Sequence, residues 1–283
     1  MIRTVRSIEE EARVRLVSGP GMDAFLVDPG LTDAVEGGVV DDLVAWGTDG
    51  VRRALVVGLE DRGSLALRLA KAGVFVTIVE PDETLLEPVR MAADAAKCSL
   101  RMNLYASDYM HREFAASGFD LAVFLSALSR YNEPVVVMKK AGRELRAGGK
   151  VFARIRVRPG LPAVPQRLAS LEWTGRIVAE ANRLAASVPG LSAWLALPEA
   201  EAFLASASEV FKLEKIERRH VLAPALAWVT LALGDRGRAV LPLLPRARIV
   251  DDAMLRLGPA KAIATHLIVY GLKELGLGKT FRV

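Results

Sequence analysis

The chain has 283 residues, of which 52% are hydrophobic, and it carries a formal net charge of +5 at pH 7. That length suffices for one well-filled core and an accessory region. No apolar run approaches the roughly 20 residues that span a bilayer, and the charged N-terminus lacks the apolar centre of a signal peptide. We therefore expect a cytoplasmic protein without a membrane span.

A few residue counts narrow the chemistry further. The single cysteine excludes an internal disulfide and a cysteine-based metal site, and the three histidines lie far apart, so we expect no metal centre. Glutamine and asparagine are scarce beside abundant arginine and glutamate, which is typical of a thermophile, although base composition could produce the same bias. Basic residues are spread among acids, which favours solvated faces over a nucleic-acid surface and leaves that partner open.

The most informative stretch is residues 53–80. An apolar run at 54–58 predicts a buried parallel strand, and a glycine-bearing turn follows it. An amphipathic helix then ends at Gly73, and a second strand runs into Glu80. A strand, glycine turn, helix, strand and terminal acid describe a nucleotide-binding unit. In such a unit the helix N-terminus offers N–H groups and the acid accepts hydrogen bonds from ribose hydroxyls.

The remaining periodicities extend this unit into an alternating α/β chain. We expect helices at 84–96 and 135–145, and strands at 100–106, 119–125, 150–157, 211–218 and 264–273. The expected organisation is a helical lead-in at 1–50 and an α/β domain at 51–283, with accessory helices at about 160–205 and 221–261. The last of these segments is an apolar insertion that could line a pocket for an apolar acceptor, or could pack as a cap or a homodimer contact.

Three arginines alternate near the end of the expected fifth strand, at Arg154, Arg156 and Arg158. Period two places them on one face. Because a buried central strand should not hold them, we expect them at its carboxyl end, where open α/β sheets bind substrates. There they could hold a phosphate or a carboxylate, or pair with neighbouring acids.

Two passages resemble the class I S-adenosylmethionine-dependent methyltransferases. ELRAGGKVFARI at 144–155 is similar to the helix–glycine–strand passage of that family, and FDLAVFLSAL at 119–128 to its fourth strand. The resemblance covers 43–158 and returns at 203–218 and 264–273. It implies an α/β, Rossmann-like three-layer sandwich with a seven-stranded, mostly parallel sheet and an antiparallel last strand. It also implies S-adenosylmethionine as the cofactor and methyl displacement from its sulfonium as the reaction.

The first motif departs from the family's pattern. Glu60 stands where the middle glycine belongs, and the turn is one residue longer. A degenerate cofactor site is therefore the alternative to an S-adenosylmethionine site.

The resemblance also implies roles for individual residues. Glu80 would hold the ribose hydroxyls, Asp108 would accept from the adenine amino group, and Tyr131 or His111 would remove a proton where the acceptor requires it. The alternatives are a surface acid at Glu80 and a helix cap at Asp108. The residues implied to contact the cofactor are Gly58, Glu60 (or Asp61), Gly63, Glu80, Pro81, Asp108, Tyr109 and Ser126.

Three functions remain open at this point. Methyl transfer to a small, potentially apolar acceptor leads, because the SALSRY segment after the fourth strand lacks the N/D-P-P-Y motif of nucleobase methyltransferases. An RNA or protein methyltransferase comes second, and a non-catalytic member with a role in assembly or regulation comes third. A nicotinamide enzyme is disfavoured because its G-x-G-x-x-G fingerprint is absent.

Overall fold

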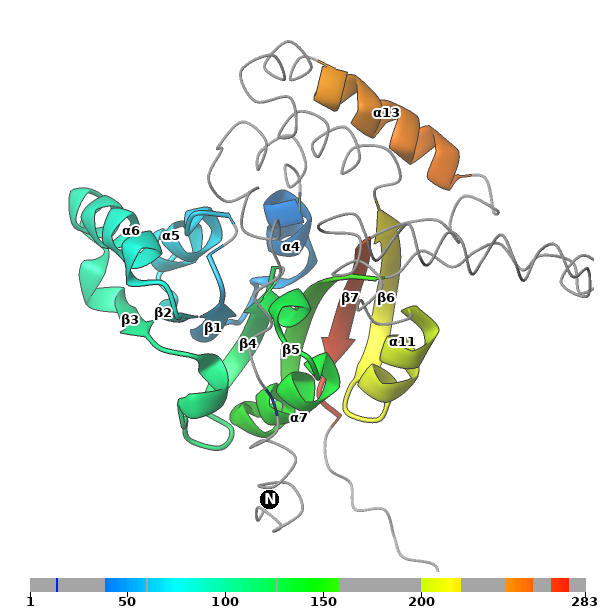
Figure 1. Ribbon diagram of the computed structural model, residues 1–283. Coiled ribbons are helices and arrows are strands. Elements are labelled where there is room, and N and C mark those ends of the chain that lie inside the picture. Colours follow the sequence, from blue (N-terminus) through cyan, green and yellow to red (C-terminus); the bar gives the residue numbers. More distant parts are fainter. Residues whose placement is uncertain are drawn as a thin grey trace, which may run out of the picture.

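The computed structural model describes residues 14, 39–59, 61–125, 127–157, 200–219, 243–256 and 266–274, and every structural statement below refers to these. They form a seven-stranded sheet in the order β3-β2-β1-β4-β5-β7-β6 (Figure 1). The strands are β1 Arg53–Val57, β2 Phe75–Glu80, β3 Met102–Ala106, β4 Phe119–Phe124, β5 Leu145–Arg156, β6 Lys212–Arg219 and β7 His266–Leu272. The α-helices are α4 Val39–Gly47, α5 Ser64–Lys71, α6 Glu83–Ala95, α7 Pro134–Glu144, α11 Ala200–Ser208 and α13 Leu244–Leu255. Short 3₁₀ turns are η1 Ser99–Arg101, η2 Tyr109–His111 and η3 Ala127–Arg130.

The predicted fold class is confirmed. Strands β1 to β5 pair in parallel, whereas β7 runs antiparallel to both β5 and β6. The strand order changes direction at β1, since β2 lies on one side of it and β4 on the other. Ligands of open α/β sheets bind beyond the carboxyl ends of the strands at such a point.

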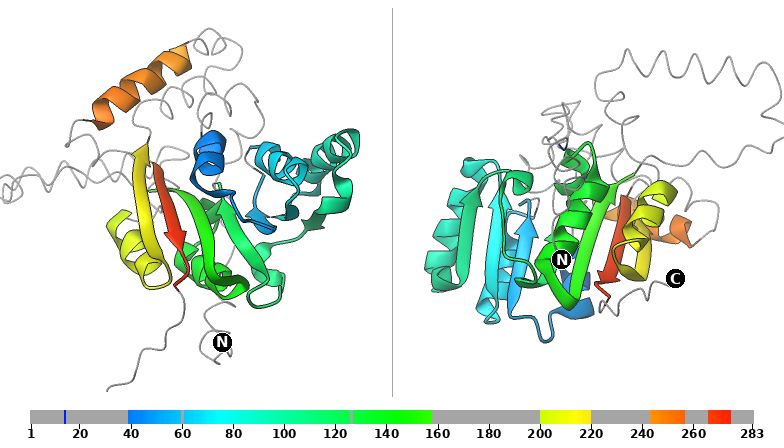
Figure 2. Two further views of the ribbon diagram at one scale, coloured as in Figure 1. Left: turned by 180° about the vertical axis from the view of Figure 1, so that it is seen from behind. Right: turned by 90° about the horizontal axis from the view of Figure 1, so that it is seen from below.

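Helices cover both faces of the sheet, as the two views of Figure 2 show. One hydrophobic cluster joins the sheet to α4, α5 and α6, and a second joins its opposite face to α7 and α11. The central strands are buried on both faces, with the burial pattern eBBBB for β1 and BiBBBB for β4. This is why these strands read in the sequence as continuous apolar runs rather than as alternating ones.

The structure corrects two details of the expected fifth strand. It starts at Leu145, not 150, because Leu145 already pairs with Phe119, and the register then shifts before Leu121. The exclusion of arginine from its interior is also wrong, since Arg154 lies within β5 and has no exposed surface. The helix expected within 160–205 is described only at α11, and that within 221–261 only at α13.

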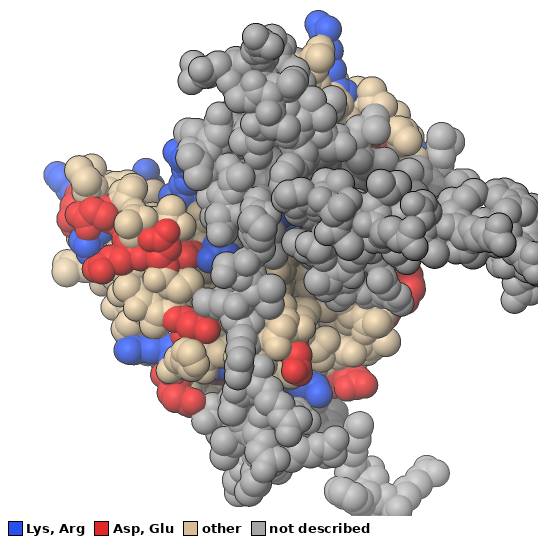
Figure 3. Space-filling view, in the orientation of Figure 1, with Lys and Arg blue, Asp and Glu red and all other residues tan. Residues whose placement is uncertain are grey.

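Charged side chains of both signs are scattered over the described part of the face in Figure 3, where Lys and Arg are interspersed with Asp and Glu around α5 and α6. Several of them form ion pairs, among them Arg90 with Glu87 and Arg68 with Asp41.

No helix in the described ranges is long and apolar enough to cross a membrane.

Gly63 generates a prediction about the turn before α5. Its φ is +78°, and a Cβ there would lie 2.6 Å from Cγ2 of Val89, a stiff β-branched side chain on α6. Gly63→Ala should therefore lower the free energy of unfolding by about 1 kcal/mol for the backbone and by a further 1–3 kcal/mol for the clash. Urea denaturation followed by circular dichroism measures this loss.

Gly50→Ala is the matched control, because Gly50 has a φ of +74° but a Cβ there would meet nothing within 4 Å. It should show the backbone cost alone. Equal losses in the two variants would contradict the tight packing of the turn against α6.

Asp120 generates a second prediction, at the amino edge of the sheet. Burial acts to raise the pKa of this carboxyl, but hydrogen bonds from the backbone N–H groups of Arg53 and Arg52 (both 2.8 Å) and from Arg146 outweigh it and lower the pKa below 3.8. A carboxyl with a lowered folded pKa stabilises the protein above its unfolded pKa and loses that contribution as pH falls through the folded value. Asp120→Asn should cost about 1–3 kcal/mol near neutral pH and progressively less below pH 3.8. Urea midpoints of both proteins across this pH range test it, and a difference independent of pH would refute it.

Candidate functional site

The turn after β1 forms the floor of the candidate site. Gly58 has a φ of +86°, which glycine adopts without a steric penalty, and its N–H donates to the carbonyl of Val79 on β2 at 3.0 Å. The chain then turns back at residues 61–63 and enters α5. The backbone therefore passes close to the carboxyl ends of β1 and β2, as the sequence predicts.

Glu80 ends β2 beside this turn, and its side chain is completely buried. One carboxylate oxygen accepts a hydrogen bond from the N–H of Leu59 at 3.1 Å, and the other from the N–H of Asp82 at 3.2 Å. These two backbone donors hold the carboxylate at the carboxyl edge of the sheet. The sequence placed this acid correctly at the end of the second strand.

Arg130 binds the same carboxylate, and sequence reasoning missed it. Nη1 of its guanidinium donates to Oε1 of Glu80 at 2.9 Å and to Oε2 at 3.2 Å, and Nη2 donates to Oε2 at 3.2 Å. Arg130 belongs to η3 after β4, whereas Glu80 ends β2, and β1 lies between these strands. The arginine therefore reaches across the end of β1. The sequence signal that could have identified this pair is a single basic residue, Arg130, shortly after β4, since the carboxyl end of β4 lies on the same edge of the sheet as Glu80.

Asp61 occupies the N-terminus of α5. Its carboxylate accepts from the N–H groups of Gly63 at 2.9 Å and Leu65 at 2.6 Å. Burial raises the pKa of Asp61 above its usual value, although these backbone hydrogen bonds oppose the shift. Two of the N–H groups expected to face a ligand thus bind a side chain of the chain itself.

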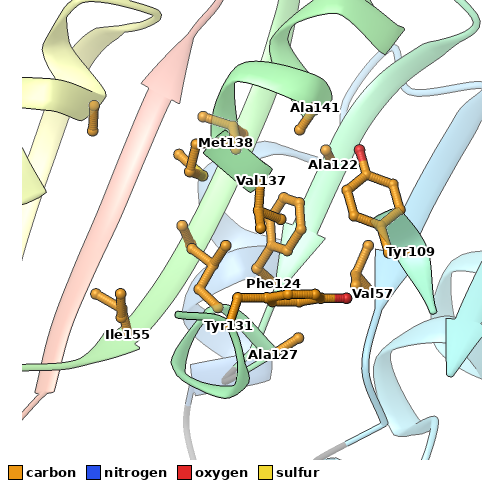
Figure 4. Packing of buried hydrophobic residues seen from close by; sticks show 14 of the residues in the cluster. Val57, Tyr109, Ala122, Phe124, Ala127, Tyr131, Val137, Met138, Ala141 and Ile155 are labelled. Carbon is orange, nitrogen blue, oxygen red and sulfur yellow. The ribbon is translucent and has the colours of Figure 1, made fainter. Parts of the chain in front are cut away.

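Asp108 and Tyr131 form a second polar group at the same edge. Asp108 accepts from the N–H of Met110 at 2.9 Å, as a cap of η2, and from the Tyr131 hydroxyl at 2.9 Å. The ring of Tyr131 lies beside Phe124 and Ala127 (Figure 4), and the residue is 6% exposed. Burial, together with the charge of Asp108, raises the pKa of Tyr131 far above its ordinary value. Tyr131 is therefore a neutral hydrogen-bond donor rather than a base.

His111 lies near this pair but faces solvent, with 79% of its side chain exposed and its Nδ1 3.8 Å from the Asp108 carboxylate. The structure thus brings Asp108, Tyr131 and His111 together.

Tyr109 lies in the core instead. It has no exposed surface, its hydroxyl donates to Glu144 on α7 at 2.5 Å, and its ring meets Phe124 edge to face (Figure 4). Lys140 completes this buried group by pairing with Glu144 and donating to the carbonyl of Arg112 at 2.8 Å. The side chain of Tyr109 therefore holds η2 against α7 in the core.

The other implied residues are partly placed. Pro81 follows Glu80 and is exposed, next to Asp82, which caps α6 through the N–H of Thr84. Glu60 and Ser126 lie outside the described residues.

The hydrogen-bond acceptors of Glu80 fit the hydroxyls of a ribose, but the Arg130 guanidinium competes for them. Two carboxylate oxygens can accept from two neighbouring hydroxyls, and the glycine turn leaves room for backbone approach. Both oxygens now accept from Arg130, so a nucleoside could use them only after the guanidinium withdraws. The Arg130 side chain is 16% exposed, which places it nearer the rim of the site than Glu80.

The chain is similar to known proteins in part of its sequence and in its fold. Residues 56–153 match a family model described as a methyltransferase domain. A search of curated proteins by sequence finds no match.

Solved structures with the same fold span most of the chain. The [4+2]-cyclase SpnF is 18% identical with a TM-score of 0.56, covering 93% of this chain and 99% of its own. Geranyl diphosphate C-methyltransferase from Streptomyces coelicolor A3(2) is 12% identical with a TM-score of 0.51, covering 84% of this chain and 79% of its own. Phosphoethanolamine N-methyltransferase 2 from Haemonchus contortus is 16% identical with a TM-score of 0.54, covering 90% and 60%. Residues 56–153 are therefore similar to a methyltransferase domain, and the sheet that contains them has the Rossmann-like fold of the class I S-adenosylmethionine-dependent methyltransferases.

Proposed function

We propose that this protein binds S-adenosylmethionine and transfers its methyl group to a small-molecule acceptor. The observation that carries the proposal is the position of Glu80, a buried carboxylate held by backbone N–H groups beside the left-handed turn at Gly58. The methyltransferase-domain match at residues 56–153 and the fold shared with solved methyltransferases support it.

The residues of the site would bind and orient the cofactor. Glu80 would accept from two ribose hydroxyls, with Leu59 and Asp82 fixing its carboxylate in advance. Gly58 and Gly63 would let the backbone approach the cofactor. Asp108 would accept from the adenine amino group with Oδ2, since the Tyr131 hydroxyl donates to Oδ1. When bound, the cofactor supplies an activated methyl group, and the protein contributes proximity, alignment and exclusion of water.

Any proton from the acceptor would go to His111 rather than to Tyr131. The Tyr131 hydroxyl already donates to Asp108 and its pKa is strongly raised, so it cannot accept a proton near neutral pH. His111 has an exposed imidazole with a carboxylate 3.8 Å from its Nδ1. An exposed imidazole is within reach of an acceptor's proton, as a general base must be.

A small acceptor is favoured over a nucleic acid. The described surface in Figure 3 mixes acids and bases around α5 and α6, and a polyanion requires a continuous basic area. Two of the similar structures are complexes with small phosphorylated molecules, geranyl diphosphate and phosphomonomethylethanolamine.

A non-catalytic role is the second candidate, and the Arg130–Glu80 pair is the observation that favours it. A charge-assisted pair is stronger than the hydrogen bonds of neutral hydroxyls. If Arg130 stays bound to Glu80, the protein keeps its fold, but Glu80 cannot accept hydrogen bonds from a ribose. The similarity to a protein described as a cyclase is compatible with a use of this fold other than methyl transfer.

Binding of S-adenosylhomocysteine distinguishes the two candidates. Titration calorimetry should detect binding to the wild type, and Arg130→Gln should bind about tenfold or more tightly, because one charge-assisted hydrogen bond to Glu80 need no longer be broken. The same variant should unfold more easily, since it leaves a buried carboxylate without its cation. Glu80→Gln should weaken binding.

Arg146→Gln is the matched control, because it also removes an arginine–carboxylate pair, with Asp120, at the opposite edge of the sheet. It should leave the affinity for S-adenosylhomocysteine unchanged. Absence of binding at millimolar ligand by both the wild type and Arg130→Gln would remove the methyl-transfer proposal and leave the non-catalytic one.

A further inference from the structure

A buried ion pair lies on the inner face of α7. Lys140 and Glu144 are four residues apart, one turn of the helix, and are 1% and 4% exposed. They share this face with Val137 and Ala141, which belong to the hydrophobic cluster between α7 and the sheet. Replacing a buried ion pair by apolar side chains of similar volume often leaves stability unchanged or raises it. Stability alone is therefore a weak explanation for these two charges.

Both charged side chains reach the short turn η2. Glu144 accepts from the Tyr109 hydroxyl at 2.5 Å, and Lys140 donates to the carbonyl of Arg112 at 2.8 Å. Nζ of Lys140 also lies 4.5 Å from the centre of the Tyr109 ring, within the range of a cation–π contact. Because η2 spans Tyr109–His111, the pair binds its first residue and the residue that follows its last. Both ends of the turn are thus tied to α7.

The same turn carries Asp108, the residue implied to bind adenine. Oδ1 of Asp108 accepts from the N–H of Met110 at 2.9 Å and from the Tyr131 hydroxyl at 2.9 Å. The Asp108 carbonyl accepts from the N–H of His111 at 3.1 Å. The orientation of the carboxylate therefore depends on where η2 lies. Since both hydrogen bonds described for the carboxylate use Oδ1, Oδ2 is the oxygen that can accept from a ligand.

We propose that Tyr109, Lys140 and Glu144 are positioning residues that set the base preference of the cofactor site. They hold η2 so that Asp108 presents Oδ2 to the amino group of adenine. This inference rests on the proposed function, because it assigns the adenine end of that same site. None of the three side chains touches the cofactor, and each acts through Asp108.

The chemistry of the base gives this positioning a measurable consequence. Adenine presents an amino donor where hypoxanthine presents a carbonyl oxygen, and a carboxylate oxygen accepts from the first and repels the second. A site built to bind a donor strongly rejects an analogue that lacks it. Because a hydrogen bond weakens steeply with distance and angle, a displaced Asp108 loses both the affinity and the preference.

The triple variant Tyr109→Phe/Lys140→Met/Glu144→Leu separates positioning from stability. It replaces three polar side chains by apolar ones of similar size and leaves no charge buried, so its urea midpoint should stay near or above that of the wild type. The wild type should bind S-adenosylhomocysteine at least about tenfold more tightly than S-inosylhomocysteine. The variant should bind S-adenosylhomocysteine about tenfold more weakly and lose most of this preference, both measured by titration calorimetry.

Hydrogen exchange measures the position of η2 without any ligand. The N–H groups of Met110, His111 and Arg112 close this turn by hydrogen bonds to Asp108 and Tyr109. They should exchange about tenfold faster in the triple variant, whereas the amides of β1 should keep their wild-type rates.

Met138→Ala is the matched control. Met138 is also fully buried on α7, but it lies two positions from Lys140 and thus about 200° around the helix. Its truncation should lower the urea midpoint through the cavity it leaves, with base preference and η2 exchange unchanged. Equal changes in preference and exchange in Met138→Ala and the triple variant would overturn the proposal, as would wild-type preference and exchange in the triple variant.

The cofactor proposal and the positioning inference can fail separately. If the wild type binds S-adenosylhomocysteine and S-inosylhomocysteine equally well, the cofactor proposal stands and the inference falls. If neither the wild type nor Arg130→Gln binds S-adenosylhomocysteine, the proposed function is removed. The exchange rates then decide whether the three side chains position η2, and unchanged rates in the triple variant overturn that role.

Discussion

The ion pair between Glu80 and Arg130 determines whether the carboxylate at the end of β2 is available to a ligand. A buried carboxylate at the end of β2 receives hydrogen bonds from Leu59 and Asp82, and a guanidinium from beyond β4 completes its shell. Burying an ionised carboxylate is costly unless it is paired. Without a ligand, the pair with Arg130 therefore stabilises the same site that a ribose would need. Stability of the ligand-free protein and affinity for a nucleoside are opposed at this one residue.

This opposition follows from the topology. Parallel strands place the ends of β2, β1 and β4 along one edge, so a side chain after β4 can reach an acid after β2 by crossing only β1. The glycine at the end of β1 allows the chain to turn sharply beside this pair, because a larger residue at Gly58 would adopt its φ of +86° only with strain.

The sequence predicted the elements better than the contacts. Apolar runs, glycine stops and the terminal Glu80 predicted the strands along the chain and the acid's place, because they depend on local periodicity. The ion pair of Arg130 with Glu80 joins residues 50 apart, and no local pattern specifies it. Asp108 illustrates a middle case, since its cap of η2 was foreseeable as an alternative, whereas the hydrogen bond from Tyr131 required the fold. Tyr109 was assigned by its position next to Asp108, yet the 3₁₀ turn directs it into the core.

Arg154 shows why an exclusion based on composition can fail. A buried strand disfavours an isolated arginine, but β7 and β6 bring His266, Arg219 and Glu217 to the same face and create a polar interior there. The carboxyl edge therefore carries charged groups at both ends, the Glu80–Arg130 pair near β2 and arginines on β5 and β6. No periodicity within β5 itself specifies this environment, because the other two strands follow much later in the chain.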